Sequence, residues 1–170
     1  MQKKKLLCAI ILFGMIFFYS NGFAQAKYSK GYIVMLNNDT LRGEIKTNAK
    51  REFDSFTKIA YRKSEGNEIK TFLPKKTKGY CVDSTMFVSK KIDEDVMFVK
   101  LLSSGTAAEN IYEAQIQYEA MNDIKVNSDY YIEKENKDFV KIKSKKATKL
   151  IEDAKAKKKR IEVAELGLKD

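Results

Sequence analysis

Two short apolar runs separated by a compact polar turn are the most constraining feature of this 170-residue chain. Residues 31–36 and 41–46 flank Asn37, Asn38 and Asp39, residue types that tolerate a positive φ and hydrogen-bond their own backbone, as hairpin turns require. The pattern predicts a β-hairpin with a two-residue loop, at either Asn38–Asp39 or Asn37–Asn38. The two loops differ in register by two residues, so both place the same side chains on one face. These side chains are Tyr32, Val34, Leu36, Leu41, Gly43 and Ile45.

The first 24 residues have the three parts of a secretory signal peptide. Lysines at 3–5 precede an apolar run at 6–19, and Gly22 and Ala24 supply the small residues before a cut after Ala24; a cut after Ala26 is the alternative. A transmembrane anchor competes with this interpretation, but the run of 14 residues is shorter than the roughly 20 that span a bilayer. We therefore expect export, with no transmembrane segment after cleavage.

Composition places limits on the remaining 146 residues, which suit one domain with its own core. Only Cys81 remains, so no internal disulfide can form, and its place between Tyr80 and Val82 favours a small apolar residue in a strand. The 33 basic residues include three lysines before the cut, which leaves 30 against 23 acidic residues and a net charge of +7. An exported basic protein meets anionic lipid head groups, lipopolysaccharide, cell-wall polymer or acidic protein surfaces. We expect an envelope protein or an anionic envelope surface as partner, and no nucleic acid.

Further short apolar runs predict that residues 25–143 form a β-rich domain. Runs at 58–62 and 68–73 flank a turn containing Gly66 and predict a second hairpin, which Pro74 ends because proline cannot donate to the ladder. Additional strands are expected at 80–82, 86–88 and 96–102, and the last of these, nearly continuous in apolar residues, is expected to be the most buried. After a polar connection at 121–129, residues 130–134 and 139–143 predict a final hairpin.

Residues 110–120 fit two interpretations. Tyr112, Ala114 and Ile116 alternate with polar residues in a period of two, which favours a half-buried strand. Ile111, Ala114, Tyr118 and Met121 also fit one face of a helix, and Glu, Gln and Ala favour helix. We choose the strand, because its alternation has no exception. The predicted fold is thus mainly β, with about eight short, mostly antiparallel strands in a curled sheet or partly open barrel.

Residues 144–170 predict a basic amphipathic α-helix at the C-terminus. Ser144 is a suitable N-cap, Ala147, Leu150, Ile151 and Ala154 lie at helical spacing, and Gly167 is a suitable stop. An apolar stripe opposite many lysines is what a helix needs to contact an anionic surface. The candidate contact residues are Lys145, Lys146, Lys149, Lys155, Lys157, Lys158, Lys159 and Arg160. The competing interpretation is that the stripe packs on the sheet while the lysines face solvent.

The opening hairpin also carries a resemblance to a known group of proteins. Residues 31–34 followed by Asp39, Thr40, Leu41 and Gly43 resemble the first hairpin of uncharacterised secreted β-rich domain proteins of Bacteroidota, and the run 130–132 is similar to later strands of that group. The resemblance implies a β-rich fold and the cell envelope of a Gram-negative bacterium, in the periplasm or at the surface. It transfers no site residue.

The sequence contains no obvious catalytic or metal-binding motif. Histidine is absent and one cysteine remains after cleavage, so zinc, haem and iron–sulfur ligand sets are missing, and we expect no cofactor. The acids at 93–95 lack the spacing of a calcium loop, and Asp39 and Glu44 are expected to point in different directions rather than form a hydrolytic pair. Four tyrosines are candidates for a sugar- or peptide-binding platform, although alternating strand tyrosines usually belong to a core. They are Tyr112, Tyr118, Tyr130 and Tyr131.

These observations favour a non-enzymatic, exported cell-envelope protein that acts as a binding or adaptor module. The alternative is electrostatic binding to a membrane or a lipopolysaccharide surface through the C-terminal helix. A hydrolase that uses only carboxylates and hydroxyls is the third hypothesis, and it requires two facing acids in a deep pocket.

Overall fold

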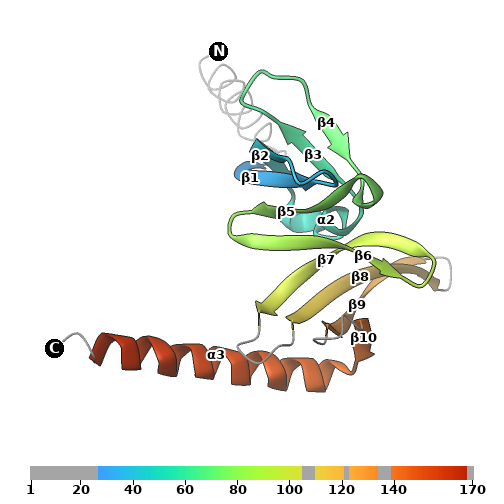
Figure 1. Ribbon diagram of the computed structural model, residues 1–170. Coiled ribbons are helices and arrows are strands. Elements are labelled where there is room, and N and C mark those ends of the chain that lie inside the picture. Colours follow the sequence, from blue (N-terminus) through green and yellow to red (C-terminus); the bar gives the residue numbers. More distant parts are fainter. Residues whose placement is uncertain (1–26, 105–109, 121–122, 134–138, 168–170) are drawn as a thin grey trace, which may run out of the picture.

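The computed structural model describes residues 27–104, 110–120, 123–133 and 139–167, with the side chains of residues 49 and 160–167 outside the description. The predicted signal peptide at 1–24 lies outside these ranges. The described chain forms ten strands, two short 3₁₀ turns and two helices (Figure 1). The strands are β1 (Lys27–Met35), β2 (Thr40–Thr47), β3 (Ile59–Arg62), β4 (Lys70–Phe72), β5 (Thr77–Val82), β6 (Thr85–Ile92), β7 (Asp95–Ser104), β8 (Asn110–Ala120), β9 (Asp123–Glu133) and β10 (Phe139–Ile142). The 3₁₀ turns are η1 (Ala49–Arg51) and η2 (Pro74–Lys76), and the helices are α2 (Asp54–Thr57) and α3 (Ser144–Gly167).

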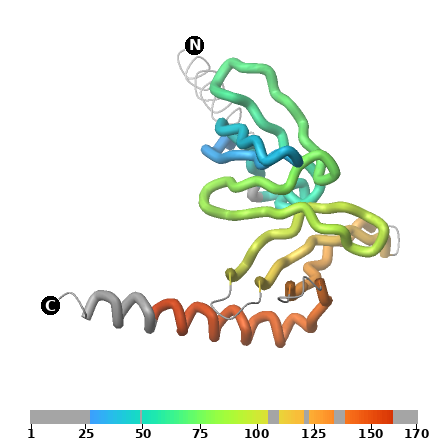
Figure 2. The backbone as a smooth tube through the Cα atoms, in the orientation of Figure 1, coloured from blue at the N-terminus to red at the C-terminus, as the bar shows by residue number. Residues whose placement is uncertain are grey.

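All ten strands belong to one antiparallel sheet, in the order β10-β9-β8-β7-β6-β5-β1-β2-β3-β4. Strands β1–β4 form one meander and β5–β10 form another, and β1 pairs with β5 to join them. Figure 2 shows the two meanders as separate stretches of the chain path, blue to green and green to orange. The sheet is not closed into a barrel, so β4 and β10 are its edges. The predicted antiparallel β fold with a C-terminal helix is confirmed.

The first hairpin forms where the sequence predicts it, but with a different loop. The Met35 N–H donates to the Asp39 carbonyl at 2.8 Å and the Asn38 N–H donates to the Met35 carbonyl at 3.0 Å, so three residues form the loop. Asn38 adopts φ 71°, the left-handed conformation that closes three-residue hairpin loops. Ile33 therefore pairs with Leu41, and Ser29 pairs with Ile45.

This odd-numbered loop overturns the predicted face of β1. Ile33 is fully buried beside Ile45, whereas Tyr32 and Val34 lie half-buried on the opposite face and Leu36 is 58% exposed. The prediction was correct for β2, where Leu41, Gly43 and Ile45 share the core face, and wrong for β1. The physical reason is that changing the loop length by one residue reverses which side chains of the preceding strand face the core.

Most of the remaining strand predictions are confirmed, and one is wrong. The hairpin of β3 and β4, its end before Pro74, the strand at residues 110–120 and the β9–β10 hairpin are confirmed. The segment 121–129 was predicted as a polar connection, but β9 begins at Asp123 and pairs with β8 along its full length. Cross-strand pairing outweighs the polarity of this segment, and the sheet has ten strands instead of about eight.

Two hydrophobic cores lie on opposite faces of the sheet. The first core lies between β1–β7 and α2, where Phe56 contacts the ring of Phe87 at 5.4 Å and Tyr80 stacks on Phe87 at 4.6 Å. The second core contains Val99, Tyr112 and further residues of β6–β10. Phe98 and Val99 are adjacent in β7 and both are fully buried, one in each core. The expectation that β7 is the most buried strand is wrong, because β5 has four buried residues of six whereas β7 has two of ten.

Helix α3 follows β10 and contacts β9 and β7. Ala147 is fully buried and Leu150, Ile151 and Ala154 are half-buried, so the predicted apolar stripe packs on the sheet. Figure 1 shows α3 crossing the ends of β7 and β8 and projecting past the sheet. In the described ranges, no helix combines the length and the apolar character that crossing a membrane requires.

Candidate binding surfaces

The predicted lysines all lie on α3. Lys145, Lys146, Lys149, Lys155, Lys157, Lys158 and Lys159 are exposed, together with two acids, Glu152 and Asp153. The side chain of Arg160 lies outside the described residues. Because the apolar stripe packs on the sheet from Ala147 to Ile151, the helix presents mainly charge over this part of its length.

A cleft of about 420 Å³ lies where α3 passes the ends of β6 and β7. Met86 and Leu101 line it from the strands, and Ala154, Lys155 and Lys158 line it from the helix. A second cleft, of about 520 Å³, lies beside α2 and contains Arg51 and Asp54, whose side chains form an ion pair at 3.2 Å. Both clefts combine polar and apolar walls.

The outer part of the β8–β9 hairpin is a surface that the sequence did not reveal. β7 pairs with β8 only up to Glu113, and β10 pairs with β9 only from Tyr130 onwards. Residues 114–120 and 123–129 therefore form a two-stranded ribbon, which we call the arm, and each of its strands has one edge without a partner strand in the described chain. The arm also exposes three large apolar side chains. These are Tyr118 at 41%, Ile124 at 61% and Val126 at 45%.

A polar cluster holds the second meander in a curled shape. Lys90 of β6 forms an ion pair with Glu133 of β9, and the Tyr112 hydroxyl donates to Glu133 Oε2 at 2.8 Å. The Lys90 ammonium also lies 5.7 Å from the centre of the Phe139 ring in β10. The two Lys90 contacts connect β6 with β9 and β10, which are not its neighbours in the sheet, so they stabilise its curvature.

The contacts of Glu133 and Tyr112 shift the pKa values of both side chains. Burial acts to raise the pKa of Glu133, but the hydrogen bonds from Lys90 and Tyr112 outweigh it and the pKa lies below its usual value. Burial raises the pKa of the Tyr112 hydroxyl, and the hydrogen bond to Glu133 and its negative charge raise it further. Glu133 is thus charged and Tyr112 is a neutral donor near neutral pH.

The four tyrosines considered as a platform do not share one surface. Tyr112 and Tyr131 are buried in the second core, and Tyr131 stacks on Phe139 at 4.8 Å. Tyr130 is half-buried and Tyr118 lies on the arm. The interpretation of alternating tyrosines as core residues is correct for Tyr112 and Tyr131.

The acids considered for catalysis or metal binding are also separated. Asp39 accepts from Asn37 Nδ2 at 2.6 Å in the turn, whereas Glu44 pairs with Arg62 Nε at 2.7 Å. Asp93 and Glu94 form the exposed turn between β6 and β7. Across the residues with a described position, no group of three or more acidic or cysteine side chains could hold a metal ion.

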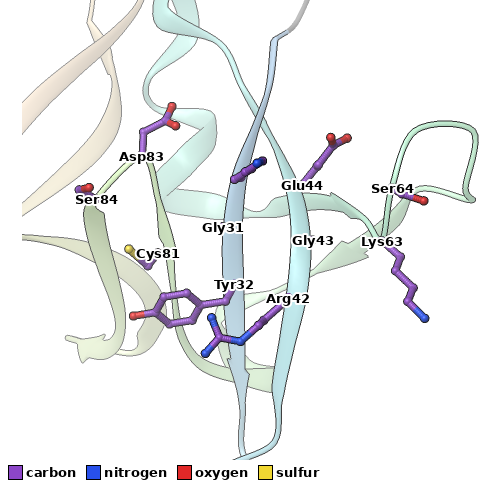
Figure 3. Close-up of a pocket in the computed structure, with 11 residues that line it drawn as sticks. Gly31, Tyr32, Arg42, Gly43, Glu44, Lys63, Ser64, Cys81, Asp83 and Ser84 are labelled. Atoms are coloured by element: carbon purple, nitrogen blue, oxygen red, sulfur yellow. The ribbon is translucent and has the colours of Figure 1, made fainter.

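A further hollow lies on the sheet face opposite the first core and has a volume of about 710 Å³ (Figure 3). The pairing of β1 with β2 and β5 forms one row of Arg42, Tyr32 and Cys81. A second row contains Glu44 and Lys30, beside the turn residue Asp83, whose N–H donates to the Lys30 carbonyl at 3.4 Å. Lys63, Ser64 and Ser84 complete the lining. Cys81 is a free, half-buried thiol in β5, consistent with its predicted place in a strand.

No expectation drawn from the sequence includes the arm or the hollow. The alternation of Ile124 and Val126 with Asp123, Lys125 and Asn127 is a signal for β9 that was available. The hollow had no such signal, because Tyr32, Arg42 and Cys81 become neighbours only when β1 pairs with both β2 and β5.

The chain matches no protein-family model, no curated protein and no solved structure.

Proposed function

We propose that this protein is a non-enzymatic, exported cell-envelope protein that acts as a binding or adaptor module. The arm is the surface that carries this proposal. It combines two strand edges that no described strand of this chain pairs with and exposed apolar side chains, and a segment of a partner protein can add to such an edge as a further strand.

The energetics of a two-stranded ribbon support a binding role. An isolated hairpin is marginally stable in water, and the arm extends past the strands that support the base of β8 and β9. A partner strand would supply the missing ladder of hydrogen bonds and would cover Ile124 and Val126, which are exposed on one face of β9. Export is proposed from the leader at residues 1–24, and the lack of histidine supports a non-enzymatic role.

The test is capture of proteins from the envelope fraction of the native cell at low and moderate salt. We expect a specific protein to be retained by the wild-type chain at moderate salt and lost by the double variant Ile124→Lys/Val126→Lys. Both positions are exposed, so the fold should tolerate the change. Lys91→Glu, an exposed change in β6, serves as the matched control. Retention of the same protein by the arm variant would refute the role of the arm.

A second candidate function is electrostatic binding to an anionic envelope surface through α3. The observation that favours it is the row of exposed lysines on a helix that projects past the sheet. Binding to vesicles that contain phosphatidylglycerol should then weaken steeply with salt, because the Debye length shortens from about 10 Å at 0.1 M to about 3 Å at 1 M. The variant Lys155→Gln/Lys157→Gln/Lys159→Gln should lose this binding, whereas the arm variant should keep it.

A further inference from the structure

The backbones of β1, β2 and β5 form the floor of the hollow, and the first core packs against the other side of this floor. Gly31 and Gly43 pair with each other between its two rows, and no side chain rises from this central pair. A Cβ atom at Gly43 would lie 2.5 Å from the Tyr61 ring on the core side, so the core packs directly against the floor. The Tyr61 hydroxyl donates to the Arg42 carbonyl at 2.9 Å, which holds the backbone that carries the Arg42 side chain.

The two rows define the width of the hollow. Residues 30 and 32 of β1, like residues 42 and 44 of β2, are two positions apart, which corresponds to about 7 Å along a strand. Figure 3 shows Tyr32 and Arg42 on one side of the glycine pair and Glu44 and Asp83 on the other. The hollow is open to solvent, so a chain can lie across the sheet in it.

The charges of the hollow favour an anion. Lys30, Arg42 and Lys63 are exposed cations, and Glu44 already has an ion-pair partner in Arg62. Asp83 is thus the acid that offsets three cations. The Arg42 guanidinium lies 5.9 Å from the centre of the Tyr32 ring and can bind a planar carboxylate through two parallel hydrogen bonds.

The other lining groups are suited to hydroxyls. Asp83 and Glu44 carry carboxylate acceptors, and Ser64 and Ser84 both donate and accept. The Tyr32 ring supplies an apolar surface with a polar edge, against which the C–H groups of a sugar ring can pack. The closely spaced phosphates of a nucleic acid would meet the carboxylate of Asp83.

We propose that this hollow binds an acidic carbohydrate chain, with Arg42, Lys30 and Lys63 contacting its carboxylates and Asp83 and the serines contacting its hydroxyls. The site lies on β1, β2, β5 and the β3–β4 loop, and the arm lies on β8 and β9. This inference therefore goes beyond the proposed adaptor role, and either can fail without the other.

The test is an NMR titration of the cleaved, full-length mature chain with oligogalacturonate, a uronic-acid oligosaccharide. We expect saturable shifts centred on the amides of residues 30–32, 42–44 and 81–84. Arg42→Gln should weaken binding by about tenfold or more, because a charge-assisted bidentate contact is lost. Lys70→Gln, an exposed change on β4 outside the hollow, should bind like the wild type, and so should the arm variant Ile124→Lys/Val126→Lys.

Three outcomes would overturn the proposal. Equal affinity of Arg42→Gln and wild type would exclude the hollow as the site. Equal binding of a neutral malto-oligosaccharide would exclude recognition of the acid groups. Tighter binding of single-stranded DNA or of phosphatidylglycerol vesicles at the same residues would assign the hollow to another class of ligand. Lys63→Gln provides a second variant. Lys63 is exposed and lies outside the strands, so a lower affinity of this variant would not be caused by misfolding of the sheet.

Discussion

Gly43 illustrates how a single residue controls the junction between the core and the outer face. A Cβ atom at this position would lie 2.5 Å from the carbonyl oxygen of Arg62 and 2.5 Å from the Tyr61 ring. Real Cβ atoms do not approach backbone oxygens so closely, so β2 and β3 can pair here only if residue 43 has no side chain. Gly31 faces a similar restriction from the Cys81 carbonyl at 2.3 Å.

Gly43→Ala is expected to lower the free energy of unfolding by about 1–3 kcal/mol, because overpacking displaces β3 or the Tyr61 ring. Urea unfolding of the chain from residue 25 onwards measures the effect. Gly66→Ala is the informative control: Gly66 has φ +80° in an open turn with no atom near its Cβ position, so only backbone strain of about 1–2 kcal/mol is expected. If Gly43→Ala also changes the oligogalacturonate affinity, the floor of the hollow has moved. A stability equal to that of the wild type would contradict the packing argument.

Glu133 makes stability depend on pH. Its folded-state pKa lies below the unfolded value, because its hydrogen bonds from Lys90 and Tyr112 outweigh the opposing effect of burial. The stabilisation is therefore complete above the unfolded pKa of about 4.3 and is lost as the pH falls through the folded value. We expect Glu133→Gln to be less stable than the wild type by about 1–3 kcal/mol at pH 7, the range for hydrogen bonds to charged groups.

This difference should close as the pH falls below the unfolded pKa, because the wild-type carboxyl then becomes protonated. Thermal unfolding of both proteins over a pH series measures it, and Glu65→Gln in the exposed β3–β4 turn provides the control. A difference that stays constant from neutral to acid pH would show that Glu133 acts through packing and not through its charge.

At the scale of elements, α3 joins the sheet through a small part of its surface. Ala147 is fully buried where the helix leaves β10, while Ala156 is exposed about two and a half turns further along. The contrast shows that the first turns of the helix belong to the packed body and that later turns are held mainly by helical hydrogen bonds. The lysines of the later turns are exposed, and two of them, Lys155 and Lys158, line the cleft between α3 and the ends of β6 and β7.

Ala147→Leu should destabilise the protein by about 1–3 kcal/mol, since no space exists for the added atoms. Ala156→Leu should leave stability nearly unchanged, because leucine is almost as good a helix former as alanine and the site is exposed. Circular dichroism during thermal unfolding of the two variants checks this. Equal effects of the two substitutions would mean that the start of α3 does not pack against the sheet.

At the scale of the whole molecule, one sheet carries two cores on opposite faces. Phe98 and Val99 connect them, because neighbouring residues of β7 point in opposite directions and each is fully buried. A mechanical link of this kind couples the two meanders, since β7 cannot leave one core without leaving the other.

We therefore expect the two cores to unfold together. Phe98→Ala should cost about 3–5 kcal/mol, and the loss should appear equally in the hydrogen-exchange protection of Ile33 in the first core and Tyr131 in the second. Val99→Ala should also lower the hydrogen-exchange protection of Ile33 and of Tyr131 by the same amount. Loss of protection in only the core that was mutated would show that the meanders are separate cooperative units.

The sequence alone determined the features that depend on neighbouring residues. Alternation within residues 110–120 identified β8 against a helical alternative, Pro74 marked the end of the second hairpin, and the spacing of Ala147, Leu150 and Ile151 located α3. Local pattern suffices in these cases because strand and helix periods, and the restrictions on proline, operate over a few residues.

Tertiary structure decided which surfaces these elements expose. The left-handed conformation of Asn38 set the loop length and hence the buried face of β1. The sequence did not determine this loop length, because Asn37 and Asp39 can also adopt a positive φ. The early end of β7 pairing at Glu113 created the arm, and the pairing of Tyr32 with Cys81, 49 positions later in the chain, created the hollow. Contacts between residues so far apart leave no periodic trace in the sequence, because their geometry exists only after the sheet has assembled.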